Sequence, residues 1–73
     1  MTYLEAVTIE QKFMVRLEFA ETIGREKLKI VEDVAAGFTK EQLAEALIVL
    51  KNKKQEEMIA LTALFALAIR SKQ

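Results

Sequence analysis

Apolar residues recur at helical spacing in two parts of the chain, residues 25–36 and residues 40–50. Because side chains three and four positions apart lie on one face of an α-helix, each pattern predicts an amphipathic helix. The first set comprises Leu28, Ile30, Val31, Val34 and Ala35, and the second comprises Leu43, Ala46, Leu47 and Leu50.

Three stretches have the sequence of an N-terminal capping box, in which a Thr oxygen and a Glu or Gln side chain three residues later satisfy free backbone amides. Those at residues 2–5 and 8–11 predict a first helix that begins near residue 2 or near residue 8 and runs to about Ile23. Gly24 then provides the left-handed conformation that commonly ends a helix. The sequence leaves both starting points open.

The boundary before the third helix is the best marked in the chain. Gly37 is predicted to be left-handed, with Phe38 folding back onto the preceding turn and a capping box at residues 39–42 opening a helix at about residue 40. No Gly or Pro follows before residue 70. One helix of about 31 residues, roughly 46 Å long, therefore competes with two helices separated near Asn52.

The segment 58–69 is apolar except for Thr62. A helix that is apolar on every side is a buried helix, so its bulky face and its small face both need cover. Because the remaining helices of one chain are few and short, we expect a second copy to pack against it as a homodimer, with a monomer's core helix as the alternative. The residues assigned to this self-association surface are Leu61, Leu64, Phe65, Ala60, Ala63 and Ala68. The segment is too short to span a membrane, which needs about 20 residues.

A second candidate surface lies on the outer side of the helix that begins at about residue 40. Glu41, Glu45 and Asn52 mark its solvent side, and Ile48 falls among them where an amphipathic helix places a polar residue. An apolar centre within a polar rim is typical of recognition surfaces, so these four residues are predicted to bind a partner protein. The alternative is that Ile48 is covered by the first helix or by a second subunit.

Composition supports the helical prediction and adds a reason for self-association. The 73 residues include no Pro, Cys, His or Trp and only two Gly, so turn and strand signals are few. Hydrophobic residues make up 52% of the chain, and a chain of this length buries only about 60% of its surface. We therefore predict an all-α fold, with one domain over residues 1–73 that forms a small bundle of three or four helices and associates through its apolar C-terminal helix.

Charge and functional-group content argue against several classes of function. Eleven basic and eleven acidic residues cancel, and acids interleave with the basic clusters, so nucleic-acid binding is not expected. There is no His or Cys, and Ser71 is the only serine, so the usual nucleophile and base pairs cannot form. We expect no enzymatic activity, metal or cofactor. The N-terminal residues lack a secretory signal, which favours a cytoplasmic location.

Residues 36–47 read Ala-Gly-Phe-Thr-Lys-Glu-Gln-Leu-Ala-Glu-Ala-Leu, which resembles the opening of a helix-turn-helix DNA-binding unit. The resemblance implies a small DNA-binding transcriptional regulator. In that family a glycine and a small polar residue then turn the chain into a recognition helix. Here residues 48–51 continue as Ile-Val-Leu-Lys, so no DNA-contacting residues are assigned.

The function predicted from these patterns is a small regulatory or inhibitory protein-binding module that acts as a homo-oligomer. Adaptors, antirepressor-like or antitoxin-like regulators and phage inhibitors of host factors belong to this class. A DNA-binding regulator is the first alternative, and a structural assembly subunit is the second.

Overall fold

Four α-helices make up the described part of the chain, residues 1–53 and 58–72 of a computed structural model. They are α1 (Tyr3–Ile23), α2 (Lys27–Ala35), α3 (Lys40–Lys53) and α4 (Met58–Arg70), and no strand occurs among the residues described. The predicted all-α class is confirmed. Residues 40–70 contain two helices, as in the alternative with a separation near Asn52, and not one helix of about 31 residues.

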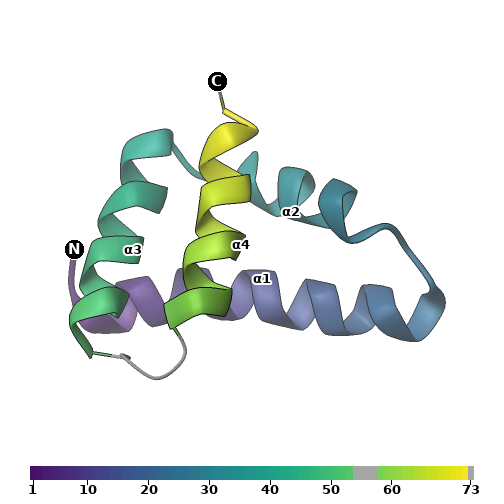
Figure 1. The fold of residues 1–73 in the computed structure, drawn as a ribbon, viewed down its shortest axis with the longest axis horizontal. Helices are drawn as coiled ribbons and strands as arrows, with labels where there is room; N and C mark the ends of the chain where they lie inside the picture. Colours follow the sequence, from purple (N-terminus) through teal and green to yellow (C-terminus); the bar gives the residue numbers. More distant parts are fainter. Residues whose placement is uncertain (54–57, 73) are drawn as a thin grey trace.

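The helices form a ring in which each packs mainly against two others (Figure 1). The long helix α1 contacts α2 and α3, and α4 in turn contacts both α2 and α3. The radius of gyration of the Cα atoms is 11.6 Å. A compact chain of this length is expected to have a radius of about 11 Å, so the helices are fully packed together rather than extended.

The first capping box determines where α1 begins. The Thr2 hydroxyl accepts from the Glu5 amide at 3.2 Å, and the Glu5 carboxylate accepts from the Thr2 amide at 3.1 Å. Thr8, the alternative start, lies inside the helix, where its hydroxyl donates to the Leu4 carbonyl at 2.8 Å. The helix ends at Gly24, whose φ of 73° is left-handed as predicted.

The predicted cap at Gly37 is wrong, because Gly24 is the only described residue with a positive φ. After α2, Ala36 stays right-handed, with φ −59° and ψ −22°. The amides of Gly37 and Phe38 then bond the carbonyls three residues before them, at 3.1 and 3.0 Å. This tightened last turn satisfies the helix end, so no left-handed residue is needed.

The capping box at residues 39–42 forms as predicted and opens α3. The Gln42 amide donates to the Thr39 hydroxyl at 3.0 Å, and the Thr39 amide donates to the Gln42 side chain at 2.8 Å. The helix continues through Asn52 and ends at Lys53, so the separation falls near Asn52 as predicted, with Asn52 itself inside the helix. The connection at residues 54–57 lies outside the described residues.

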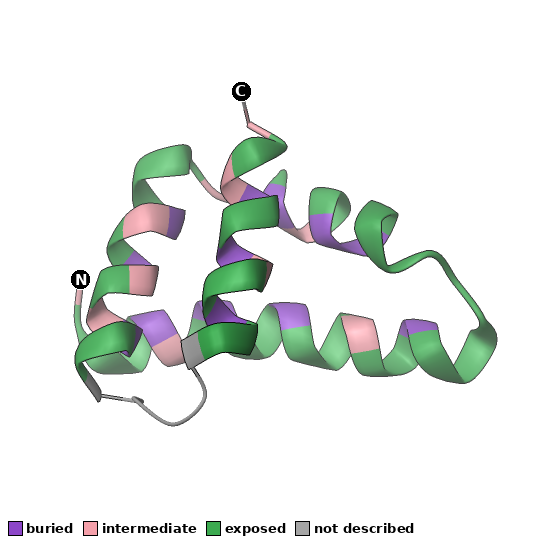
Figure 2. Ribbon diagram, in the orientation of Figure 1, coloured by how far each residue is buried: buried purple, intermediate pink, exposed green. Residues whose placement is uncertain are grey.

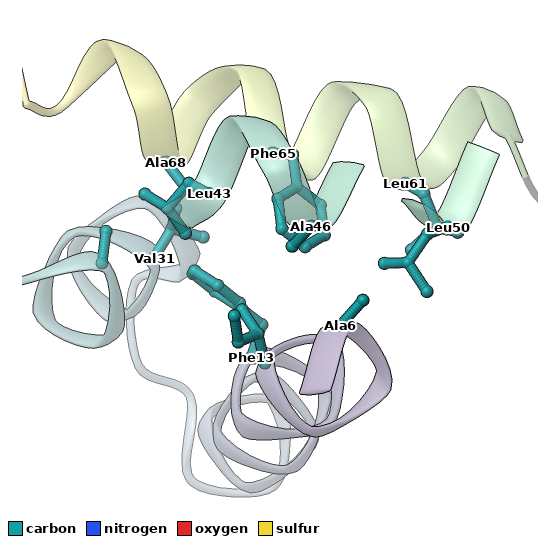
Figure 3. Close-up of a cluster of buried hydrophobic side chains, with 11 residues drawn as sticks. Ala6, Phe13, Val31, Leu43, Ala46, Leu50, Leu61, Phe65 and Ala68 are labelled. Carbon is teal, nitrogen blue, oxygen red and sulfur yellow. The ribbon is translucent and has the colours of Figure 1, made fainter. Parts of the chain in front are cut away.

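The core lies inside the ring and is built around aromatic side chains (Figure 3). Phe13 of α1 and Phe65 of α4 are fully buried with ring centroids 5.7 Å apart. Phe38, just before α3, stacks on Phe13 with ring centroids 6.5 Å apart. Leu43 and Leu50 are the fully buried leucines of α3. In Figure 2, the buried stretches lie on the sides of the helices that face one another, and exposed stretches cover their outer sides.

Candidate protein-interaction surfaces

The structure divides the residues that the sequence assigned to self-association. Leu61, Phe65 and Ala68 are buried within the single chain, with exposed fractions of 5%, 0% and 0%. Leu64 is half-buried against the same core, whereas Ala60 and Ala63 are exposed. The bulky side of α4 therefore completes the chain's own core, because α1, α2 and α3 together enclose it. Only the opposite side of α4 is open to another molecule.

That open side is an uncovered apolar surface, which we call the α4 outer face. It consists of Ile59, Ala60, Ala63, Ala66 and Leu67, all exposed. Ile59 is 91% exposed and Leu67 is 41% exposed. At about 100° per residue, the five positions fall within an arc of about 120°. No charged side chain interrupts this face before Arg70 in the last turn.

The four residues predicted to bind a partner lie together on the solvent side of α3. Ile48 is 61% exposed, and Glu41, Glu45 and Asn52 are exposed around it. We call these four residues the α3 outer face. None of the four described helices covers Ile48, so the alternative in which α1 buries it does not hold.

Glu45 also bonds a residue outside α3. Its carboxylate accepts a hydrogen bond from the Met1 amine at 2.6 Å. This bond and the attraction between the two charges raise the pKa of the amine. The carboxylate remains 53% exposed and retains lone pairs for a further donor.

A groove between α1 and α2 was missed by the sequence reasoning. It has a volume of about 530 Å³ and is open to solvent along one side. Its lining residues are Gln11, Lys12, Val15 and Arg16 from α1, with Asp33, Val34, Gly37 and Phe38 from α2 and the turn that follows it. We call this hollow the α1–α2 groove.

The sequence held one signal for the groove. Val15, Phe19 and Ile23 recur every four residues along α1, and they are 60%, 58% and 46% exposed. Together with the buried stripe on the opposite side, they make α1 apolar on two sides. A helix of this kind has more apolar surface than one core needs.

Other classes of site find little support in the described structure. Within residues 1–53 and 58–72, no three acidic side chains lie close enough together to hold a metal ion. None of the described helices is long and apolar enough to cross a membrane. Comparisons with protein-family models, with curated proteins and with solved structures gave no match. The proposed function therefore rests on the α4 outer face, the α3 outer face and the α1–α2 groove.

Proposed function

We propose that this protein is a small protein-binding module that acts as a homo-oligomer and regulates or inhibits the chains it binds. The observation that supports the proposal is the α4 outer face, an apolar helix surface that no described part of the chain covers. The chain exposes 5048 Å². This area is about a tenth more than the roughly 4,600 Å² expected for a folded monomer of 8.3 kDa.

The size of the α4 outer face suits a weak and reversible contact. Burying Ile59 contributes roughly 2 kcal/mol and burying the exposed part of Leu67 about 1 kcal/mol. A symmetric pair of copies doubles these values to about 6 kcal/mol, against an association cost of about 4 kcal/mol or more. The three alanines let the two helices approach closely, which adds dispersion contacts. Burying the methyl groups of these alanines contributes about 0.8 kcal/mol each, or about 5 kcal/mol for the pair of copies, which brings the apolar gain to about 11 kcal/mol. With an association cost of about 4 to 7 kcal/mol, about 4 to 7 kcal/mol remains, which corresponds to a Kd in the micromolar to millimolar range.

The second part of the proposal is that the α3 outer face binds another protein chain. Its apolar centre, Ile48, gains free energy by losing water, whereas Glu41, Glu45 and Asn52 discriminate between partners through charge and hydrogen bonding. This face and the α4 outer face lie on different helices. One copy can therefore use both surfaces at once.

Sedimentation velocity tests self-association through α4. The wild-type mass is expected to rise with concentration across the micromolar range. Ile59→Lys is expected to weaken association at least tenfold, because the ammonium loses its water in the contact. Leu4→Lys is the matched control, since Leu4 is 74% exposed and lies on α1. A wild type that stays monomeric throughout, or equal effects of the two variants, would contradict the proposal.

DNA binding remains the alternative, and the surface of α4 does not favour it. In a helix-turn-helix unit that opens with α3, α4 would be the recognition helix. Such a helix presents polar side chains to base edges. The α4 outer face instead presents Ile59, Leu67 and alanines, with Arg70 alone contributing a charge.

A further inference from the structure

The α1–α2 groove combines an apolar floor with a charged rim. Val15, Val34 and Phe38 supply the apolar lining. Lys12 and Arg16 lie on the α1 side of the groove, and the Lys12 ammonium sits 5.2 Å from the centre of the Phe38 ring. This cation–π contact holds Lys12 beside the apolar floor. The groove therefore suits an apolar side chain accompanied by carboxylates.

The positive charge of this region is local. A second hollow shares Asp33 with the groove and adds Arg25, Glu26, Lys29 and Ile30 to its lining. The two hollows together carry four basic and two acidic side chains, a net charge of +2, although the whole chain is neutral. Within the described residues, no salt bridge joins Lys12 or Arg16 to an acid. Their charges are available to an incoming chain.

The α3 outer face has the complementary pattern. Glu41 and Glu45 are four residues apart, as are Lys12 and Arg16, so each pair is separated by about 6 Å along its helix. Ile48 follows Glu45 by one turn and is 61% exposed, nearly the same as the 60% of Val15 in the groove. Both surfaces thus present an apolar side chain beside a pair of charges, and the charges are of opposite sign.

We infer that the α3 outer face of one copy docks in the α1–α2 groove of a second copy. The inference rests on the proposed function and names the chain that the α3 outer face binds. Ile48 enters between Val15, Val34 and Phe38, as in other complexes where an amphipathic helix lies in a groove. Glu41 and Glu45 face Lys12 and Arg16 of the second copy. Lys51, on the edge of the same side of α3, supplies a cation for Asp33.

The chemistry of the groove favours a protein helix over a nucleic acid. A phosphate backbone gains nothing from the apolar floor of Val15, Val34 and Phe38, and it is repelled by Asp33, which lines both hollows. An amphipathic acidic helix satisfies the floor and the rim together. The α3 outer face is such a surface, because two acids, Glu41 and Glu45, lie beside the exposed Ile48.

The contact joins two different surfaces, so it is a head-to-tail contact rather than a self-complementary one. Such contacts close into pairs or rings when the rotation between copies allows it, and otherwise continue as open chains. Neither surface includes a residue of the α4 outer face. Association through the groove therefore continues when the α4 contact is removed, which makes the two contacts separable by mutation.

Charge reversal on each side, followed by mixing, tests the inference. All proteins carry Ile59→Lys, so that the α4 contact is weakened throughout. The groove variant adds Lys12→Glu and Arg16→Glu, and the face variant adds Glu41→Lys and Glu45→Lys. Each variant alone brings like charges together and is expected to lose association at least about tenfold. An equimolar mixture restores opposite charges and is expected to regain the association of the parent.

A matched control keeps the result specific. Glu18→Lys with Glu32→Lys changes the net charge as the face variant does, at exposed positions outside the groove and the α3 outer face. We expect this control to associate like the parent and not to restore the groove variant. Circular dichroism melting of each protein verifies that it is folded before sedimentation. Ile48→Lys, at an exposed position, provides a second way to block the face, because it replaces the apolar centre with an ammonium while Glu41 and Glu45 stay in place.

The outcomes separate the two proposals. A mixture that stays monomeric, or a parent with Ile59→Lys that does not associate, overturns docking between copies. Loss of association in the groove variant without rescue by the face variant also overturns it and assigns the groove to another chain. Self-association through α4 is tested separately. If the wild type and Ile59→Lys have equal masses in sedimentation at every concentration, the α4 contact does not form. Binding of a duplex DNA oligonucleotide that the groove variant abolishes would assign the groove to phosphate.

Discussion

Replacing Phe65 with alanine tests whether α4 belongs to the core of one chain or to a contact between chains. Phe65 is fully buried and contacts Phe13, which in turn stacks on Phe38. The substitution leaves a cavity at the centre of this aromatic cluster, because the backbones of four helices surround the site and limit collapse. We expect Phe65→Ala to destabilise the fold itself.

The expected magnitude follows from burial and ring contacts. Truncating a buried Phe to Ala costs about 3 to 5 kcal/mol, of which the Phe13 pair contributes about 0.5 to 1.5 kcal/mol. A domain of 73 residues has a total stability of about 4 to 11 kcal/mol. Phe65→Ala therefore removes a large part of the free energy of unfolding. Phe65→Leu, which keeps most of the volume, is expected to cost about 1 kcal/mol.

Urea denaturation followed by circular dichroism measures these values, at a low and a high protein concentration. A core residue gives the same change in unfolding free energy at both concentrations, whereas a residue in a subunit contact gives a change that depends on concentration through mass action. Leu4→Ala, at a position 74% exposed, is the control and should change stability by less than about 0.5 kcal/mol. A cost below about 1 kcal/mol for Phe65→Ala, or one that disappears at high concentration, would refute the core assignment.

Three further predictions concern single positions. Gly24→Ala should cost about 1 to 2 kcal/mol in urea denaturation because its φ is 73°, whereas Gly37→Ala should be nearly neutral, since its new Cβ meets only the Val34 carbonyl at 3.5 Å. Ile48→Lys should keep its helical circular dichroism and melting temperature, while its association in sedimentation should fall to that of the α4 contact alone; a lower melting temperature would show that the site is structural. The Thr2 backbone amide and hydroxyl lower the pKa of Glu5 below its usual 4.5. Its stabilising contribution is therefore complete above that value and is lost as pH falls through the lowered pKa, so Glu5→Gln should reduce the loss of stability measured on acidification below pH 4.5.

The parts of the fold that depend only on residues close together in the sequence were predictable. The capping boxes at residues 2–5 and 39–42 form because their donors and acceptors are three residues apart, whatever the rest of the chain does. The conformation of Gly37 was not predictable in this way. It depends on the direction in which α3 leaves α2, and this path is set by packing of Phe38 against Phe13. A glycine permits a left-handed residue but does not require one.

The candidate surfaces were predictable only in part, for two different reasons. The helical spacing in segment 58–69 separates a bulky side from a small side, but its single polar residue, Thr62, is too little to show which side faces the protein's own core. The structure assigns the bulky side, with Leu61 and Phe65, to the core. Local patterns could show only that α1 has apolar residues on two sides. They could not locate the α1–α2 groove, because Val15 and Phe38 meet only after the chain has folded. Ile48 was placed correctly on the solvent side because α3 has a clear apolar stripe.

Ionic strength provides a last prediction, because the two proposed contacts differ in their physical basis. The α4 outer face carries no charge between Ile59 and Leu67, so its association depends on apolar burial. Docking in the α1–α2 groove depends in addition on Lys12 and Arg16. Exposed charge pairs are screened as the Debye length shortens from about 10 Å at 0.1 M salt to about 3 Å at 1 M.

Raising the NaCl concentration from about 0.05 M to 1 M should therefore leave the α4 contact intact and weaken the groove contact. In sedimentation, the protein with Ile59→Lys is expected to become monomeric at high salt, because only the groove contact remains in it. The protein with Ile48→Lys retains only the α4 contact, so its association should be unchanged or slightly stronger. If both variants responded to salt in the same way, charge would not distinguish the two surfaces, and the pairing of Glu41 and Glu45 with the groove would be wrong.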